Sequence, residues 1–153
     1  KGLSNITCSE YGWGTIYKSE NAQNLEETGK QAAVRHTRDM NSPDIQELFI
    51  RNQQYLESII QKCNERNIKV ILITTPAYSS YVQNLDNKQL KSTTDYLNKV
   101  DSVYPNCIYY NFLEHPAFTA EDYYDADHLS EIGAKKLSLI LNTISKSTNN
   151  EKQ

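Results

Sequence analysis

The sequence predicts a three-layer α/β/α domain with a mainly parallel sheet. From residue 43 onward, the hydrophobic patterns alternate in the order helix, strand, helix, strand, helix, which is typical of α/β domains with right-handed crossovers. The run Lys69 to Thr75 is short, β-branched and continuously apolar, and it is closed by Pro76. Such a run indicates a parallel strand covered on both faces. The 153 residues match the size of one ordinary domain.

Residues 1–42 form a weakly patterned amino-terminal segment. A short helix is expected over about residues 26–40, interrupted early by Gly29. Two strands are too few for a complete open sheet, so the sheet is expected to be incomplete on its amino-terminal side. Either residues 6–10 and 15–18 supply further strands, or the chain is the carboxyl-terminal portion of something longer.

The domain proper is expected over residues 43–147, and it opens with an amphipathic helix. Ser42 can cap this helix, Pro43 suits its first position, and Asp44 complements the positive end of its dipole. The helix should run to about Arg66. Its apolar face recurs at three- and four-residue steps and consists of Ile45, Leu48, Phe49, Tyr55, Leu56, Ile59, Ile60 and Cys63.

Three further elements follow the predicted strand at 69–75. A helix is expected from Asp86 to about Ser102, and a second strand from Cys107 to Phe112. The last helix should span residues 131 to about 145, with Ser130 as its cap. Its inner face would consist of Leu137, Ile140, Leu141 and Ile144. Residues 148–153 are expected to be a solvated tail.

Composition excludes several classes of partner. Sixteen Lys and Arg against nineteen Asp and Glu give a net charge of −3 that is spread along the chain, so nucleic acid is not an expected partner. The longest apolar stretch, Val70 to Ile73, is far too short for a membrane span. The three cysteines are widely spaced and form no CxxC pair, so neither a disulfide framework nor a zinc site is indicated. No cofactor is predicted.

The segment most suited to chemistry is the loop before the last helix. In an open parallel sheet, ligands bind beyond the carboxyl ends of the strands, which points to residues 75–81 and 113–130. The second loop places Asp122, Asp125, Asp127 and His128 within seven positions. An Asp three residues before a His can accept the imidazole Nδ1 proton, which leaves Nε2 as a base. Gly133 would allow another segment to approach the helix closely.

The block Asp125-Ala-Asp-His128-Leu-Ser130-Glu-Ile-Gly133 resembles the last conserved block of the SGNH (GDSL-like) hydrolase superfamily. Its surroundings are similar to the polysaccharide O-acetyltransferase branches of that superfamily. The resemblance implies a flavodoxin-like fold, with His128 as catalytic base and Asp125 as its orienting partner. It also implies activity on O-acyl, above all O-acetyl, groups of a carbohydrate or acylated glycan, and a place at the bacterial cell envelope.

The family's Gly-Asp-Ser nucleophile block and its Gly-x-Asn-Asp block do not occur in this sequence. The nucleophile is therefore expected to lie outside this chain, and the chain alone is expected to be inactive. Three residues are candidates for substrate binding. Ser79 follows the first strand, Tyr78 could stack on a sugar ring, and His36 could approach the pocket from the amino-terminal segment.

Two alternatives stay open. The chain could be a non-catalytic binding or structural α/β domain, in which the Asp-x-x-His turn only ties the last helix to the sheet. The acidic residues of the loop could also hold a hard cation together with one imidazole, although their spacing fits no standard metal-binding loop.

Overall fold

The computed structural model describes residues 9–10, 14 and 16–150, the last two by their backbone only. It shows a mixed α/β fold that is 59% helix, with a two-stranded parallel sheet and a small hairpin. The predicted alternation of helix and strand is confirmed. In chain order the elements are η1 (Ser19–Asn21), α1 (Leu25–His36), α2 (Pro43–Glu65), β1 (Val70–Thr74), α3 (Ser79–Val82), α4 (Asn87–Val103), β2 (Cys107–Asn111), η2 (Ala120–Asp122), β3 (Tyr123–Asp125), β4 (His128–Leu129) and α5 (Glu131–Asn150).

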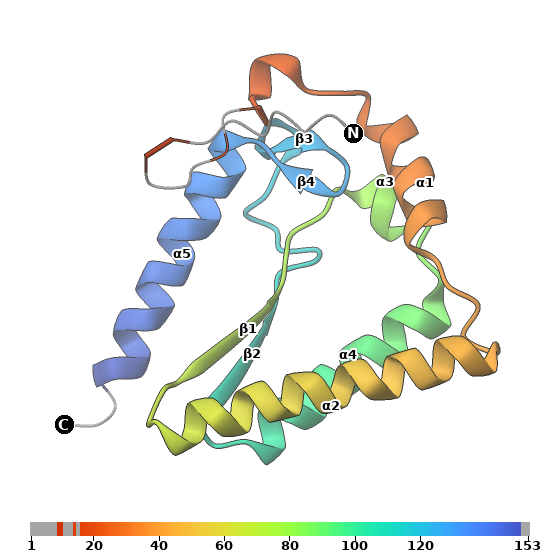
Figure 1. Ribbon diagram of the computed structural model, residues 1–153. Coiled ribbons are helices and arrows are strands. Elements are labelled where there is room, and N and C mark those ends of the chain that lie inside the picture. The colour runs from red at the N-terminus through yellow and green to blue at the C-terminus, as the bar shows by residue number, and fades with distance from the viewer. Residues whose placement is uncertain (1–8, 11–13, 15, 151–153) are drawn as a thin grey trace.

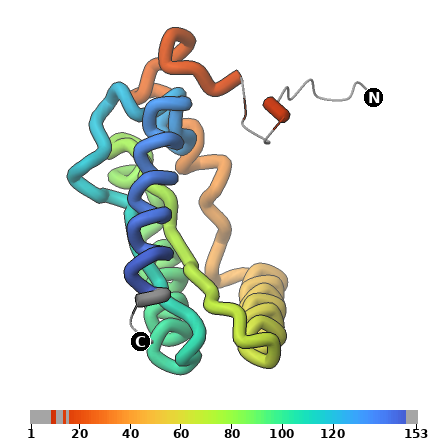
Figure 2. The backbone as a smooth tube through the Cα atoms, turned by 90° about the vertical axis from the view of Figure 1, so that its left-hand side faces the viewer, coloured from red at the N-terminus to blue at the C-terminus, as the bar shows by residue number. Residues whose placement is uncertain are grey.

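Strands β1 and β2 pair in parallel, with Val70 opposite Cys107 and Thr74 opposite Asn111. Helix α5 stands on one side of this pair, and α2 and α4 stand on the other (Figures 1 and 2). Val70 and Leu72 pack toward α2 and α4, so alternation directs the side chains between them to the opposite face. The core where these elements meet is formed by Ile60, Val100 and Cys107.

The prediction that β1 is covered on both faces is wrong in degree, because all five of its residues are only half-buried. Strand β1 has a single partner strand, β2, in the part of the chain that the structure describes. The backbone N–H and C=O groups of Ile71 and Ile73 point away from β2. No described residue makes a hydrogen bond with these groups. No described segment therefore covers the outer edge of β1.

Helix α2 begins as predicted but is less covered than its pattern indicates. Pro43 occupies the first turn and Asp44 adds a negative charge there, whereas the Ser42 side chain makes no capping bond. Ile60 is fully buried, but its neighbour Ile59 remains 56% exposed. The apolar face of α2 that residue spacing predicts is therefore wider than the part of α2 that β1, β2 and α4 cover.

Gly29 does not interrupt a helix, contrary to the sequence-based prediction. It lies on the buried side of α1, where a Cβ atom would overlap the backbone of Ser80 in α3. Helix α1 ends at His36, earlier than expected, because Thr37 adopts an extended conformation. Of the strands expected at 6–10 and 15–18, residues 6–8 and 15 lie outside the described residues. The remainder form no strand.

Helix α5 extends beyond its predicted end at Ser145. Its backbone continues through residues 148–150, which the sequence assigned to a solvated tail, and Thr148 is buried and accepts a hydrogen bond from Lys69. Gly133 permits the close approach that was predicted, since a Cβ atom there would overlap the Asp122 carbonyl. Among the described residues, no helix combines the length and apolarity that a bilayer span requires.

Candidate functional site

The candidate site lies on the β3–β4 hairpin, directly before α5. The strands pair antiparallel, with Asp125 opposite His128 and residues 126 and 127 in the turn between them. Ala126 is fully buried, and its backbone is held from two sides. Its N–H donates to Thr28 Oγ1 at 3.2 Å, and its carbonyl accepts from Tyr78 N–H at 2.9 Å. The turn is therefore anchored to α1 and to the segment after β1.

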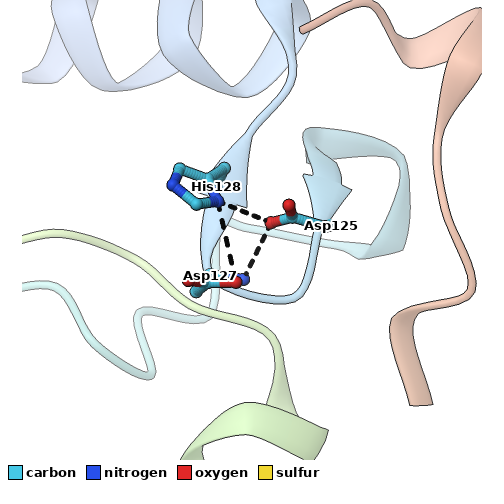
Figure 3. A group of neighbouring side chains, drawn as sticks. All are labelled: Asp125, Asp127 and His128. Atoms are coloured by element: carbon cyan, nitrogen blue, oxygen red, sulfur yellow. Dashed lines mark hydrogen bonds and ion pairs between the residues drawn. The ribbon is translucent and has the colours of Figure 1, made fainter. Parts of the chain in front are cut away.

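The predicted contact between Asp125 and His128 is present. Asp125 Oδ1 lies 2.8 Å from His128 Nδ1, a hydrogen-bonding distance. The other ring nitrogen, Nε2, points away from the carboxylates (Figure 3). The Asp125 side chain is 14% exposed and the His128 ring 48%. Tyr17 stacks on this ring, with centroids 5.5 Å apart and planes inclined by 22°. The imidazole is thus hydrogen-bonded at one nitrogen, while the ring as a whole remains half-exposed.

Asp127 is the buried acid of the turn, with a side chain only 6% exposed. Its Oδ1 lies 3.6 Å from His128 Nδ1 and has no hydrogen-bond partner. Its Oδ2 lies 3.7 Å from Arg35 and 3.9 Å from His36 Nε2. Burial raises the pKa of Asp127, and the charge of Asp125 adds to that rise. The three neighbouring cationic or imidazole groups oppose the rise without cancelling it.

A cavity of about 330 Å³ borders the hairpin, and His128, Asp127 and His36 line it. His36 therefore approaches the site as predicted, and its Nδ1 lies 2.8 Å from the Tyr81 hydroxyl. Burial and the nearby Asp127 charge raise the pKa of Tyr81. The other hydroxyl-bearing residues that line the cavity are Thr37, Thr74, Thr75 and Thr93, and the apolar ones are Ala77, Leu85, Leu90 and Leu113.

Tyr78 and Ser79 do not line the cavity of His128. They border another cavity of about 280 Å³, which shares the lining residue Ala77 with the first. The Tyr78 ring packs edge-on against Tyr123, with centroids 5.8 Å apart. Ser79 begins the short helix α3. The structure thus separates these two candidates from the Asp125–His128 pair.

Asp122, the fourth acid of the loop, also lies apart from the site. It is 1% exposed, and its Oδ2 lies 2.5 Å from Lys136 Nζ. The same oxygen accepts from Thr119 N–H at 2.8 Å. Burial alone would raise the pKa of Asp122, but the bonds from Lys136 and Thr119 outweigh it, so the pKa is lowered. The structure therefore brings three of the loop's four predicted cation ligands together, without Asp122.

Some residues that contact the site come from distant parts of the chain, and the sequence did not predict their presence there. Tyr17, Arg35 and Tyr81 all contact the hairpin or its neighbours, yet each lies more than forty residues before Asp127. The only local signal was the pair Arg35-His36 near the carboxyl end of a weakly predicted helix. These two neighbouring residues alone do not indicate that their side chains lie beside Asp127, about ninety positions later.

No family model, curated protein or solved structure matches this chain. Two features bear on function: the geometry of the hairpin and the resemblance of its sequence block.

Proposed function

We propose that this chain is part of an SGNH-like domain related to the O-acyl esterases and transferases that act on glycans. His128 is the base in this proposal, and Asp125 orients it. The observation that carries it is the 2.8 Å contact between Asp125 Oδ1 and His128 Nδ1, with an accessible ring bordering a cavity of about 330 Å³. An acylated glycan as substrate and a place at the bacterial cell envelope belong to the same proposal.

The proposed fold is three-layered and flavodoxin-like. The position of α5 opposite α2 and α4 across the parallel strands supports it (Figure 1). The hairpin follows the carboxyl ends of β1 and β2 in this arrangement, and Thr74 at the end of β1 lines the same cavity as His128. Ligand sites of open α/β sheets lie at that edge.

The chemistry follows from the tautomer that Asp125 selects. When Asp125 accepts the Nδ1 proton, the lone pair of the ring remains on Nε2. Nε2 can then take the proton of a serine hydroxyl as its oxygen attacks an acyl carbonyl, and it can return that proton to the departing sugar oxygen. The Asp125 carboxylate stabilises the imidazolium that forms between these steps.

The nucleophile in this proposal is a serine that is not part of this chain. The hydroxyl groups that line the cavity of His128 belong to threonines and to Tyr81. Because a serine must be supplied, the chain alone is expected to be inactive. Transfer and hydrolysis use the same base, and they differ in whether a sugar hydroxyl or water takes the acyl group.

A non-catalytic role is the second candidate, and one observation favours it. The turn also acts as a structural tie, because Asp127 lies beside Arg35 and His36 of α1 while Ala126 bonds to Thr28 of the same helix. A turn that only joins α1 to the hairpin needs no reactive imidazole. Substitution at His128 would then leave every activity of the intact protein unchanged.

The test is acetyl release by the intact protein from p-nitrophenyl acetate and from an O-acetylated oligosaccharide. His128→Ala should abolish the activity, and Asp125→Asn should lower kcat by up to about four orders of magnitude, by analogy with serine proteases. His115→Ala is the matched control, since His115 lies outside the cavity of His128, and it should retain activity. Full activity of His128→Ala would overturn the assignment.

A further inference from the structure

Three ligand-type atoms converge at the β3–β4 turn. One atom each from Asp125, Asp127 and His128 lies within 4.8 Å of the other two. His128 Nδ1 is 2.8 Å from the Asp125 oxygen and 3.6 Å from the Asp127 oxygen. Ligands of a tetrahedral Zn²⁺, bound at about 2.0–2.2 Å, lie about 3.3 Å from one another. These two separations bracket that value, and the third, between the two carboxylate oxygens, is at most 4.8 Å, so a shared ion draws the two carboxylates toward each other.

The second, independent observation is a buried carboxylate oxygen that lacks a hydrogen-bond partner. Asp127 Oδ1 has no hydrogen-bond partner, although the side chain is only 6% exposed. Figure 3 shows this carboxylate directed at the same ring nitrogen as Asp125. A buried polar atom without a partner is unfavourable, and buried carboxylates are normally paired or coordinate a metal. A cation between the three side chains would supply the missing partner.

The orientation of Asp127 is set from its other oxygen. Oδ2 faces Arg35 at 3.7 Å and His36 Nε2 at 3.9 Å, which leaves Oδ1 directed toward the turn. Groups that orient a ligating carboxylate from its far side are typical of metal sites. The arrangement therefore provides both ligands and a support for one of them.

We propose that Asp125, Asp127 and His128 bind a divalent transition-metal ion of the Zn²⁺ class through Oδ1, Oδ1 and Nδ1. One imidazole with two carboxylates suits Zn²⁺, whereas Ca²⁺ and Mg²⁺ are bound almost entirely through oxygen ligands. Three protein ligands leave a further position for water. His128 and Asp127 both border the cavity of about 330 Å³, from which that position is reached.

This site does not depend on the proposed esterase function, but it competes with it. His128 Nδ1 carries either a proton or an in-plane lone pair. It therefore cannot bind a metal while it donates a hydrogen bond to Asp125. Zn²⁺ binding therefore replaces the catalytic hydrogen bond. Bound Zn²⁺ should inhibit any acyl-transfer activity that uses the Asp125–His128 pair.

The experiment is isothermal titration of this chain with ZnCl₂. His128→Ala should abolish the binding event, and Asp127→Asn should weaken it at least tenfold, because each removes one ligand. His115→Ala and Cys63→Ser are the controls for adventitious zinc ligands, and both should bind as the wild type does. MgCl₂ should give no binding at the same concentrations.

Ring ¹⁵N NMR of the wild-type chain gives a measurement that is independent of whether a variant folds. The Nδ1 resonance of His128 should shift on addition of Zn²⁺, with the Nε2 resonance much less affected. An unshifted His128 resonance, or wild-type affinity in Asp127→Asn, would overturn the metal site. Neither readout involves enzymatic activity, so failure here and failure of the esterase proposal can be told apart.

Discussion

Two regions of this molecule are held together in different ways. In the strand region, made of β1, β2, α2 and α4, the contacts at the centre are apolar. Ile60, Val100 and Cys107 are each no more than 3% exposed there. Every one of these elements is recognisable from its own hydrophobic pattern.

The hairpin region, made of η1, α1, η2, β3, β4 and the start of α5, depends on polar contacts between distant segments. Ser19 N–H donates to Glu131 Oε2 at 2.7 Å, and Gln23 N–H donates to the Tyr124 carbonyl at 2.7 Å. Both contacts join residues about a hundred positions apart. The region that carries the candidate chemistry is thus positioned by hydrogen bonds and ion pairs, whereas the strand region is stabilised by burial.

The largest expected effect belongs to the strand region. Ile60→Ala should lower the free energy of unfolding by about 4 kcal/mol, because it removes a fully buried side chain and leaves a cavity. Urea denaturation measures this change. Ile59→Ala is the matched control on the same helix, since Ile59 is 56% exposed, and it should change stability by at most about 0.5 kcal/mol. Equal effects at the two positions would contradict the placement of Ile60 in the core.

The next largest effect is polar and belongs to the hairpin region. Asp122→Asn should lower the free energy of unfolding by about 2 kcal/mol, because it removes the charge that bonds Lys136 and the Thr119 N–H. Its matched control is Asp95→Asn, since Asp95 is 61% exposed and pairs with Lys91 on the surface of α4. If both variants lose the same stability, the hairpin region does not depend on its buried ion pair.

The same ion pair predicts a dependence on pH. The pKa of Asp122 is lowered in the folded state, so its charge stabilises the fold fully above the unfolded pKa of about 4 and less as the pH falls through the folded value. Unfolding free energies of wild type and Asp122→Asn should therefore converge as the pH falls from about 6 to well below the unfolded pKa. A difference that stays constant over that range would show that the Asp122 charge is not involved.

The contrast between the regions also explains what could be predicted from the sequence. The bounds of β1, α4 and the start of α5 were predicted to within about one residue, because apolar spacing and capping residues are local signals. The Asp125–His128 contact was predictable for the same reason, since its partners are three residues apart on one turn. In each case the residues that determine the structure lie within a few positions of one another in the sequence.

The rest of the site could not be predicted because its partners are distant in sequence. Arg35 and His36 meet Asp127 across about ninety residues, and no periodicity connects them. Asp122 shows the opposite error. Its proximity in sequence grouped it with the cation ligands, yet the 3-10 turn η2 directs it toward Lys136 on α5.

The smallest expected effect tests the junction between hairpin and helix. Ser130 caps α5 as predicted, since its Oγ accepts from Gly133 N–H at 3.4 Å and donates to the Glu121 carbonyl at 3.3 Å. Both bonds are long, so Ser130→Ala should lower the free energy of unfolding by about 1 kcal/mol, despite full burial. Urea denaturation beside Ser138→Ala, an exposed serine of the same helix, measures it. A loss larger than that of Asp122→Asn would mean that the cap, and not the ion pair, positions α5 against the hairpin.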